Sequence, residues 1–330
     1  MKAVHCLWSF LSLVALLGQQ TAQAQQKFDV SVPWGPNEFH TQNAMKFAER
    51  VKSETKGEVL LTVHPGATLG VKPNESMRAL NDGVVPFGEY ALFQNASRGQ
   101  ALAVETLPFL VENYEQLKVL HSYVRPVWDG LLAKNKQKGL YMVPWPSQYF
   151  FSKKPIAVTA DMKGLRMRSL DKLTTDWINR LGMTPVQLTN PEIVQALGSN
   201  MLDGVPTSAG TAASQKYPEF MAYGYHTNHL WATNVMAVNL DSWNTIKPEH
   251  RATIERVARE MEPEFWAVSQ AEDGKRVAEL TAKGMKIQPM PKAVVDEMRK
   301  LTFSLWAEYA KPMGPEIEAA LTAYRAKVGK

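Results

Sequence analysis

The chain has 330 residues, a formal net charge of +5 at pH 7 and a single cysteine. Its lysines and arginines are interspersed with acidic residues rather than gathered in a long basic block, which argues against nucleic acid as a partner. No internal repeat or low-complexity segment interrupts the chain.

The first 24 residues have the pattern of an export signal. Lys2 provides a positive start, residues 7–17 form an apolar stretch, and Ala-Gln-Ala at 22–24 is a small-x-small cleavage site. The apolar stretch is too short for a membrane-spanning helix. We therefore predict cleavage after Ala24 and export to the periplasm. The mature chain would lack Cys6, so neither disulfides nor thiolate chemistry would be available to it.

Strand-like and helix-like segments alternate along the first half of the mature chain. The expected elements are a strand over 28–32, a helix over 44–51, a strand over 59–63, a short helix over 77–80 and a strand over 84–93. This order is typical of an α/β protein with largely parallel sheets.

The second half continues the alternation. The expected elements are extended segments over 140–151 and 165–168, helices over 174–181 and 191–197, and a strand after 202. Pro248 then opens a long helix with apolar residues three and four positions apart, and Pro263 inside it would bend it. A helix of this length, late in a two-domain chain, could lie across both domains.

Motifs that would indicate catalysis are missing from the sequence, which has no GxSxG elbow, no HExxH and no glycine-rich phosphate loop. His226 and His229 are three residues apart, but no acidic or cysteine partner is near, so we interpret them as structural. We predict no catalytic residue, no metal and no cofactor. An exported hydrolase assembled from distant residues is the alternative from another class.

The segment Asp161–Ser169, DMKGLRMRS, contains two arginines two residues apart. Side chains alternate between the faces of a strand, so Arg166 and Arg168 would share a face opposite Leu165 and Met167. On a solvated edge both would be ordinary surface charges. Facing a cleft, one of them would be a planar fork for an anion.

Several motifs in a fixed order carry a resemblance to a known family. They are SKKPI at 152–156, DMKGLRMR at 161–168, LGMTP at 181–185, PE at 191–192 and LDG at 202–204. In the amino-terminal half, FAERVKSETKGEVLLTVHPGATLG and LPFLVENYEQ agree with them. These segments resemble the substrate-binding proteins of TRAP transporters, the DctP family, over essentially the whole mature chain.

The resemblance implies an α/β periplasmic-binding-protein clam-shell of two domains, with a long helix spanning both. Such a monomer captures a small organic acid and delivers it to a small and a large membrane subunit, driven by an ion gradient. We divide the chain into domain I, residues 25–147 plus 231–272, and domain II, residues 148–230 plus 273–330. A receptor for an ATP-driven transporter is the alternative within the same class.

The resemblance also implies a ligand site. Arg168 stands where the family's arginine pairs with the substrate carboxylate, whereas Arg166 is interpreted as a solvated charge. A second arginine common in the family is replaced by Gln148, and a common asparagine by Thr207. The site would therefore have lost a positive charge and an amide. The full candidate set is Trp34, Glu89, Tyr90, Trp145, Gln148, Arg168, Asn190, Thr207, Trp231 and Asn234.

The composition of this set predicts the chemistry of the ligand. One arginine with aromatic neighbours suits a monocarboxylate with a flat or apolar body, such as a benzoate-like or aryl 2-oxo acid. Dicarboxylates such as malate and succinate should bind less well, because a second buried carboxylate would be unpaired. Glu89 would accept a hydroxyl group from the far end of the ligand if its strand turns it inward.

Overall fold

A computed structural model describes residues 25–329. The predicted signal peptide, its cleavage site and Cys6 lie outside the described residues. Within 25–329, no helix is both long and apolar enough to cross a membrane.

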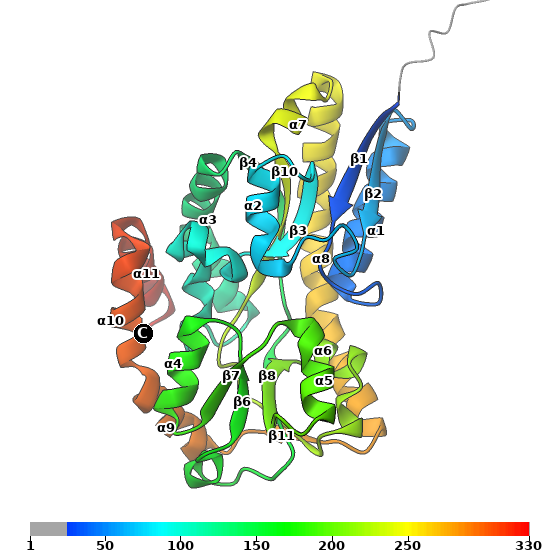
Figure 1. Ribbon diagram of the computed structural model, residues 1–330. Coiled ribbons are helices and arrows are strands. Elements are labelled where there is room, and N and C mark those ends of the chain that lie inside the picture. Colours follow the sequence, from blue (N-terminus) through cyan, green and yellow to red (C-terminus); the bar gives the residue numbers. More distant parts are fainter. Residues whose placement is uncertain (1–24, 330) are drawn as a thin grey trace, which may run out of the picture.

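Domain I, at the top of Figure 1, is built on a five-stranded sheet. In spatial order its strands are β2 (Val59–His64), β1 (Gln26–Ser31), β3 (Phe87–Ala91), β10 (Thr233–Asn239) and β4 (Gln137–Pro144). The helices of this domain are α1 (Phe39–Glu54), α2 (Ser76–Asn81), α3 (Tyr114–Lys134) and α7 (Leu240–Thr245). Strand β1 is parallel to β2 and β3, whereas β10 is antiparallel to both of its neighbours.

Domain II, at the bottom of Figure 1, is built on a six-stranded sheet. In spatial order its strands are β11 (Lys286–Pro289), β9 (Tyr223–His226), β5 (Gln148–Ser152), β8 (Gly204–Ser208), β6 (Arg166–Ser169) and β7 (Thr184–Gln187). The helices beside it are α4 (Lys172–Arg180), α5 (Ile193–Gly198) and α6 (Ala209–Ser214). Strand β5 is antiparallel to β8 and β9, and the other pairs are parallel.

The chain passes between the sheets twice before the long helix. Residues 145–147 connect β4 to β5, and residues 227–232 connect β9 to β10. The antiparallel strand of each sheet is the one that follows such a connection, because it enters its sheet from the opposite domain. The predicted boundaries at 147 and 230 fall within these connections.

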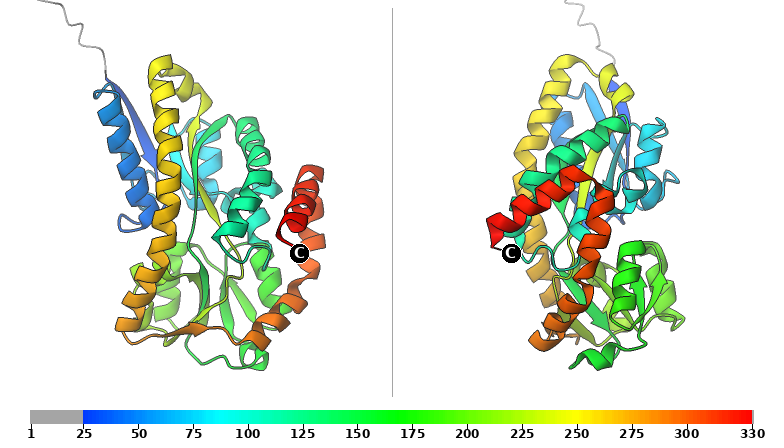
Figure 2. Two further views of the ribbon diagram at one scale, coloured as in Figure 1. Left: turned by 180° about the vertical axis from the view of Figure 1, so that it is seen from behind. Right: turned by 90° about the vertical axis from the view of Figure 1, so that its left-hand side faces the viewer.

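Helix α8 (Pro248–Ala282) runs along both domains with Pro263 inside it (Figures 1 and 2). It packs against α1 and β4 of domain I and against α6 and β11 of domain II. The predicted α/β fold of two domains with a helix spanning both is confirmed.

The carboxyl-terminal helices correct one predicted boundary. Helices α9 (Lys292–Thr302) and α10 (Ser304–Ala310) contact α4 of domain II, but α11 (Pro315–Val328) packs on α3 of domain I, as the right-hand view of Figure 2 shows. Its buried side chains Ile317 and Tyr324 face that domain, and the Tyr324 hydroxyl donates to the Leu110 carbonyl over 2.9 Å. Assigning all of 273–330 to domain II was therefore wrong for α11.

Short 3-10 helices complete the described structure, at Pro73–Glu75, Phe93–Arg98, Gln100–Thr106, Thr159–Met162, Asn190–Glu192, Tyr217–Glu219 and Lys311–Met313. The strand expected over 84–93 is shorter, because β3 ends at Ala91 and the chain turns into a 3-10 helix. The Asn95 side-chain amide donates to the Ala91 carbonyl over 3.1 Å and stabilises this turn. The helix expected over 191–197 begins as a 3-10 turn before α5.

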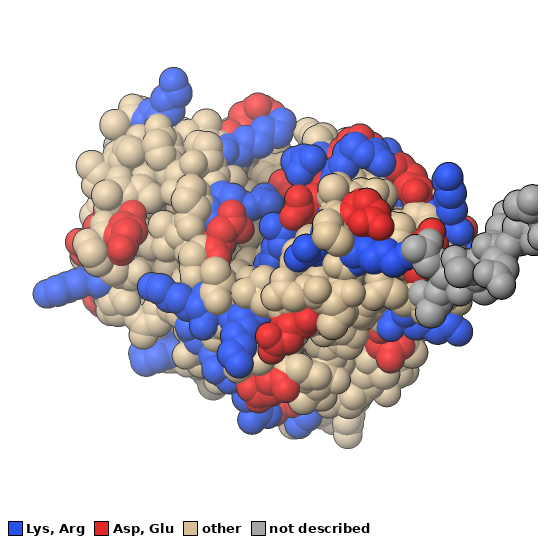
Figure 3. Space-filling model, turned by 90° about the horizontal axis from the view of Figure 1, so that it is seen from above, with Lys and Arg blue, Asp and Glu red and all other residues tan. Residues whose placement is uncertain are grey.

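The surface carries both signs of charge. Viewed from above in Figure 3, groups of lysines and arginines lie beside aspartates and glutamates over much of the face.

Candidate functional site

A cavity of about 50 Å³ lies between the two domains. Its lining residues come from the β1–α1 loop, the 3-10 helix after β3, both connections between the sheets, and the ends of β6 and β8. They are Trp34, Phe93, Gln94, Trp145, Gln148, Arg168, Leu170, Asn190, Pro206, Thr207, Ser208, Thr211, Leu230 and Ala232. We call this space the inner cavity.

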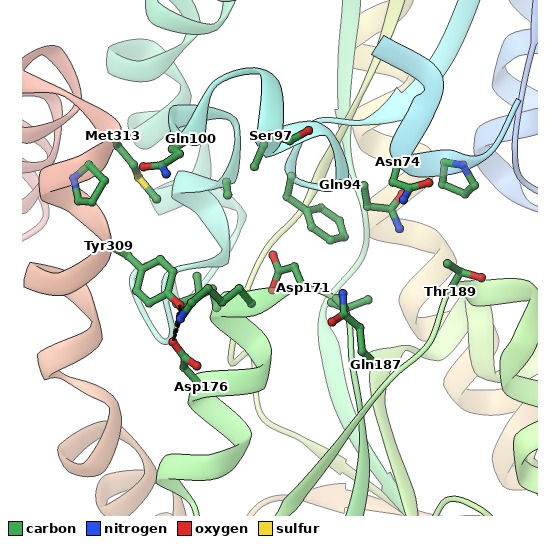
Figure 4. A pocket seen from close by; sticks show the side chains of 18 of the residues that line it. Asn74, Gln94, Ser97, Gln100, Asp171, Asp176, Gln187, Thr189, Tyr309 and Met313 are labelled. Atoms are coloured by element: carbon green, nitrogen blue, oxygen red, sulfur yellow. Dashed lines mark hydrogen bonds and ion pairs between the residues drawn. The ribbon is translucent and has the colours of Figure 1, made fainter. Parts of the chain in front are cut away.

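A larger space of about 980 Å³ adjoins the inner cavity and shares Phe93, Gln94 and Leu170 with it. Figure 4 shows this outer cavity, with Asn74 and Gln100 above and Asp171, Gln187 and Thr189 below. One water occupies about 30 Å³ of liquid, so the inner cavity holds very few waters as it stands.

Arg168 is a buried cation with few partners. It lies near the carboxyl end of β6 and is 3% exposed. Its Nε donates to the Leu188 carbonyl over 3.1 Å, and within the described chain its terminal nitrogens have no hydrogen bond and no carboxylate within ion-pair distance. Burial lowers the pKa of Arg168 to about 10, although the charges of Tyr217, Asp171 and Glu192 oppose this effect. Within residues 25–329 this buried guanidinium therefore has no anionic partner.

Arg166, two residues earlier, is paired within the protein. Its Nε and Nη2 donate to the two carboxylate oxygens of Asp203 over 2.9 and 2.8 Å, and its side chain is 41% exposed. The pKa of Asp203 is lowered to about 2, mainly by this hydrogen bonding. Arg166 is absent from the cavity lining. The strand pattern alone put both arginines on one face of β6. In the structure, Arg166 pairs with Asp203 outside the inner cavity, whereas Arg168 lines it.

Polar side chains of domain II stand beside Arg168. The register of β5 and β8 sets Gln148 opposite Ser208, and both line the inner cavity. The Gln148 amide donates to the Pro146 carbonyl over 2.8 Å, and Asn190 Oδ1 accepts from Gln215 over 3.0 Å. Thr207 lies next to Ser208 on the same strand. The inner cavity therefore combines one cation with amides and hydroxyls.

Two tryptophans of domain I form the opposite wall. The rings of Trp34 and Trp145 meet edge to face with centroids 5.1 Å apart. Trp145 Nε1 donates to Asn234 Oδ1 over 2.7 Å, whereas Trp34 Nε1 is buried with no hydrogen-bond partner among the described residues. The same is true of Gln94 Oε1. Two residues of the cavity lining, Trp34 and Gln94, thus each contain a buried polar atom without a hydrogen-bond partner among the described residues.

Four predicted contact residues do not line the inner cavity. Glu89 and Asn234 lie behind Trp145, where Asn234 Nδ2 donates to Glu89 Oε1 over 2.7 Å and His40 Nδ1 is 3.0 Å from the same oxygen. The strand turns Glu89 toward this buried network, so its expected access to a ligand hydroxyl was wrong for this conformation. Glu89 and Asn234 instead hold Trp145 in place.

Tyr90 and Trp231 belong to the core of domain I. The Tyr90 hydroxyl donates to Gln137 Oε1 over 2.6 Å, and Trp231 Nε1 donates to the Val111 carbonyl over 3.0 Å. Both side chains are almost fully buried. Their hydrogen-bonding groups are satisfied within the domain, so packing explains both residues.

Eight lining residues were not anticipated from the sequence, namely Phe93, Gln94, Leu170, Pro206, Ser208, Thr211, Leu230 and Ala232. For Ser208 and Thr211, the sequence contained a pattern from which their position at the site could have been predicted. Ser208 caps α6 by accepting from the Thr211 N–H over 3.2 Å, and this cap follows the carboxyl end of β8 directly. Ligands in open α/β sheets bind at that edge.

Within residues 25–329, no group of three or more histidine, cysteine, aspartate or glutamate side chains is arranged to hold a metal ion. His229 Nδ1 lies 2.7 Å from the Thr227 hydroxyl, and its ring stacks on Trp177 with centroids 4.8 Å apart. Burial lowers the pKa of His229 to about 3. The structural interpretation of this histidine agrees with its surroundings.

The two domains, the helix along both and a buried cation in the cleft between them define a solute receptor of the clam-shell type. Residues 30–312 match the family model of bacterial extracellular solute-binding protein, family 7, also called DctP. The chain belongs to this family, whose members are extracytoplasmic receptors of TRAP transporters, and the resemblance noted in the sequence is confirmed.

Relatives of known structure agree with this assignment. DctP7 of Bordetella pertussis, an extracytoplasmic solute receptor binding pyroglutamic acid, is 25% identical with a TM-score of 0.88, and the alignment covers 91% of this chain and 99% of that one. A marine metagenome TRAP solute-binding protein specific for pyroglutamate is 28% identical with a TM-score of 0.87, covering 92% and 99%.

A relative with a different ligand is equally similar in sequence. The C4-dicarboxylate-binding periplasmic protein DctP of Rhodobacter capsulatus is 26% identical over 85% of this chain and 83% of its own length. Sequence identity therefore does not choose between a monocarboxylate and a dicarboxylate. The residues of the cavity have to be considered for that.

Proposed function

We propose that this protein is the periplasmic receptor of a TRAP transporter for a small organic acid with one carboxylate, bound by Arg168. The observation that carries the proposal is the charge of the inner cavity. Arg168 is the only charged residue among its described lining residues, and no carboxylate within residues 25–329 pairs with it. A single buried cation neutralises one carboxylate, and a second would be buried unpaired at a cost of several kcal/mol.

The other lining groups favour a ring that carries both a donor and an acceptor. Trp34 and Trp145 supply flat apolar surface, which stabilises a ring by burial. Trp34 Nε1 can donate to a ligand oxygen, and the Gln94 amide can accept from a ligand N–H. Pyroglutamate, bound by two similar receptors, has one carboxylate, a ring N–H and a ring carbonyl. We therefore propose pyroglutamate or a closely related cyclic monocarboxylate as the ligand.

The role is binding and delivery rather than catalysis. The receptor would close over the acid, present it to the small and large membrane subunits, and leave transport to an ion gradient. Cleavage of the export signal after Ala24 and a monomeric state remain part of this proposal.

Calorimetric titration of the purified receptor tests the ligand class. Pyroglutamate, benzoate, an aryl 2-oxo acid, a short aliphatic 2-oxo acid, malate and succinate are compared side by side. We expect the cyclic monocarboxylates to bind most tightly and the dicarboxylates least. Tightest binding by malate would contradict the argument that a single cation accepts a single carboxylate. Tightest binding by the short aliphatic acid would agree with that argument but would contradict a contribution of Trp34 and Trp145 to ligand binding.

A matched variant distinguishes pyroglutamate from benzoate. Trp34→Phe keeps an aromatic ring but removes the indole N–H, so we expect it to weaken pyroglutamate binding by roughly threefold to tenfold, as for one lost hydrogen bond. Benzoate binding should change much less. Equal losses for both ligands would mean that Trp34 acts by packing alone.

A further inference from the structure

Glu38 connects the two domains beside α8. It directly precedes α1 of domain I, and its Oε1 lies 2.5 Å from the hydroxyl of Ser214, the last residue of α6 in domain II. Both α1 and α6 pack against α8. Glu38 is only 7% exposed, whereas Ser214 is exposed on its other side. A carboxyl group of one domain is thus buried against a hydroxyl of the other.

The hydrogen bonds of Ser214 depend on the protonation state of Glu38. The Ser214 hydroxyl also lies 3.1 Å from the Thr211 carbonyl, and it has one proton to donate. When Glu38 is ionised, both oxygens compete for that proton. When Glu38 is protonated, it donates to Ser214 Oγ while Ser214 donates to Thr211. Both contacts are satisfied together only with the proton on Glu38.

The charged and titratable groups around Glu38 are His40 of α1, Glu272 and Arg276 of α8, and Tyr217 after α6. Arg276 is already paired with Glu272 and with Glu279, whose Oε2 lies 2.8 Å from its Nη1. His40 is paired with Glu89. Burial raises the pKa of Glu38, with a smaller contribution from Glu272, while Ser214, His40 and Arg276 oppose the increase.

We propose that Glu38 and Ser214 form a proton-dependent latch that holds the two domains closed. When the domains separate, Glu38 meets water and regains the pKa of an ordinary glutamate. The closed form binds the proton more tightly, so closure takes up a proton. The free energy by which this proton favours the closed form over the open form is fully present below the ordinary glutamate pKa. It is lost as the pH rises through the raised pKa of Glu38 in the closed form.

The latch rests on the proposed function in one respect, since closure is what would retain the ligand. The closure itself can be measured in the receptor without any ligand. The single cysteine of the chain lies in the predicted signal peptide. In protein produced from Gln25 onward, cysteines introduced at the exposed positions Arg98 of domain I and Asn179 of domain II would be the only labelling sites. Spin labels there report the distance between the domains.

The pH dependence of that distance is measured in wild type and in Glu38→Gln, whose amide donates to Ser214 as the protonated acid would. We expect the wild-type distance distribution to shift to shorter values as the pH is lowered from neutral toward the ordinary pKa of glutamate, because burial raises the pKa of Glu38 in the closed form. Glu38→Gln should show the short distribution at every pH. Ser214→Ala, a small change at a partly exposed site, should show longer distances than wild type at low pH.

Two controls make the result specific. Glu49→Gln removes a charge from an exposed position of the same helix, where the side chain is 73% exposed, and should behave as wild type. Asp273 of α8 accepts from the Tyr149 hydroxyl over 3.1 Å, and burial raises its pKa to about 6, so Asp273→Asn tests whether this other buried carboxyl group causes the pH dependence.

The proposal is overturned if the wild-type distances do not change with pH. It is equally overturned if Asp273→Asn removes the change while Glu38→Gln leaves it. Failure to find an organic acid that binds would affect the proposed function and not this measurement.

Discussion

The two ends of β6 differ although they carry the same residue type on the same face of the strand. At its start, Arg166 is half-exposed and forms a two-pronged ion pair with Asp203. Near its end, Arg168 is buried between the domains, and within residues 25–329 its side chain makes one hydrogen bond, to a backbone carbonyl. The first arginine is neutralised by the protein, and the second is not.

The comparison shows that the counter-ion, rather than the residue type, distinguishes a structural arginine from a ligand-binding one. Burying a cation without an anion costs free energy, which a ligand carboxylate would offset. A protein that keeps such a group loses stability in the absence of the ligand and gains affinity for it. The predictions below alter one end of β6 at a time.

The largest expected effect is that of Arg168→Ala on ligand affinity. A hydrogen bond to a charged group contributes about 1.5–3 kcal/mol, and the variant also leaves the ligand carboxylate unpaired. We expect pyroglutamate to bind roughly tenfold to a thousandfold more weakly in calorimetry. Arg168→Lys should recover little, because a planar fork with two parallel donors is lost. Full recovery by lysine would show that only the charge matters.

The same position should have the opposite effect on stability. Arg168→Met keeps a long side chain but removes the buried cation, so the ligand-free variant should melt at a higher temperature than wild type, by roughly 2–4 °C for each kcal/mol gained. Scanning calorimetry without ligand measures this. A lower melting temperature would mean that the bond to Leu188 outweighs the cost of burial.

Acid stability should depend on the other end of the strand. The pKa of Asp203 is lowered to about 2, so its pair with Arg166 stabilises the fold fully above the ordinary aspartate pKa. This contribution is lost as the pH falls from about 4 to about 2. Asp203→Asn should therefore be less stable than wild type near neutral pH, and the difference should shrink in acid. A difference independent of pH would contradict the pairing.

The smallest expected effect is that of Arg166→Ala on affinity. Arg166 lies outside the inner cavity, so calorimetry should give a dissociation constant within about twofold of the wild-type value. A loss as large as that of Arg168→Ala would reverse the assignment of the two arginines.

The sequence predicted the class well, because the class depends on motifs that are continuous along the chain, and one of these motifs contains Arg168, which lines the inner cavity. Six of the ten candidate residues line the inner cavity, namely Trp34, Trp145, Gln148, Arg168, Asn190 and Thr207. All six lie in loops or near strand ends that face the cleft. Alternation identifies which strand residues share a face, but not which face looks toward the other domain.

The errors follow from that missing information. Glu89 and Asn234 lie on neighbouring strands β3 and β10, and they face a buried network around His40 instead of the cavity. The position of α11 depends on which apolar surface remains uncovered once both domains have formed, and α3 provided that surface. Such contacts between distant segments leave no periodic signal in the sequence.

The central claim is that Arg168 receives the carboxylate of the ligand, and a crystal structure of the receptor with bound pyroglutamate tests it most directly. The account predicts both carboxylate oxygens about 2.7–2.9 Å from the nitrogens of Arg168, with Arg166 still paired to Asp203. A carboxylate bound away from Arg168, with that guanidinium still unpaired, would contradict it.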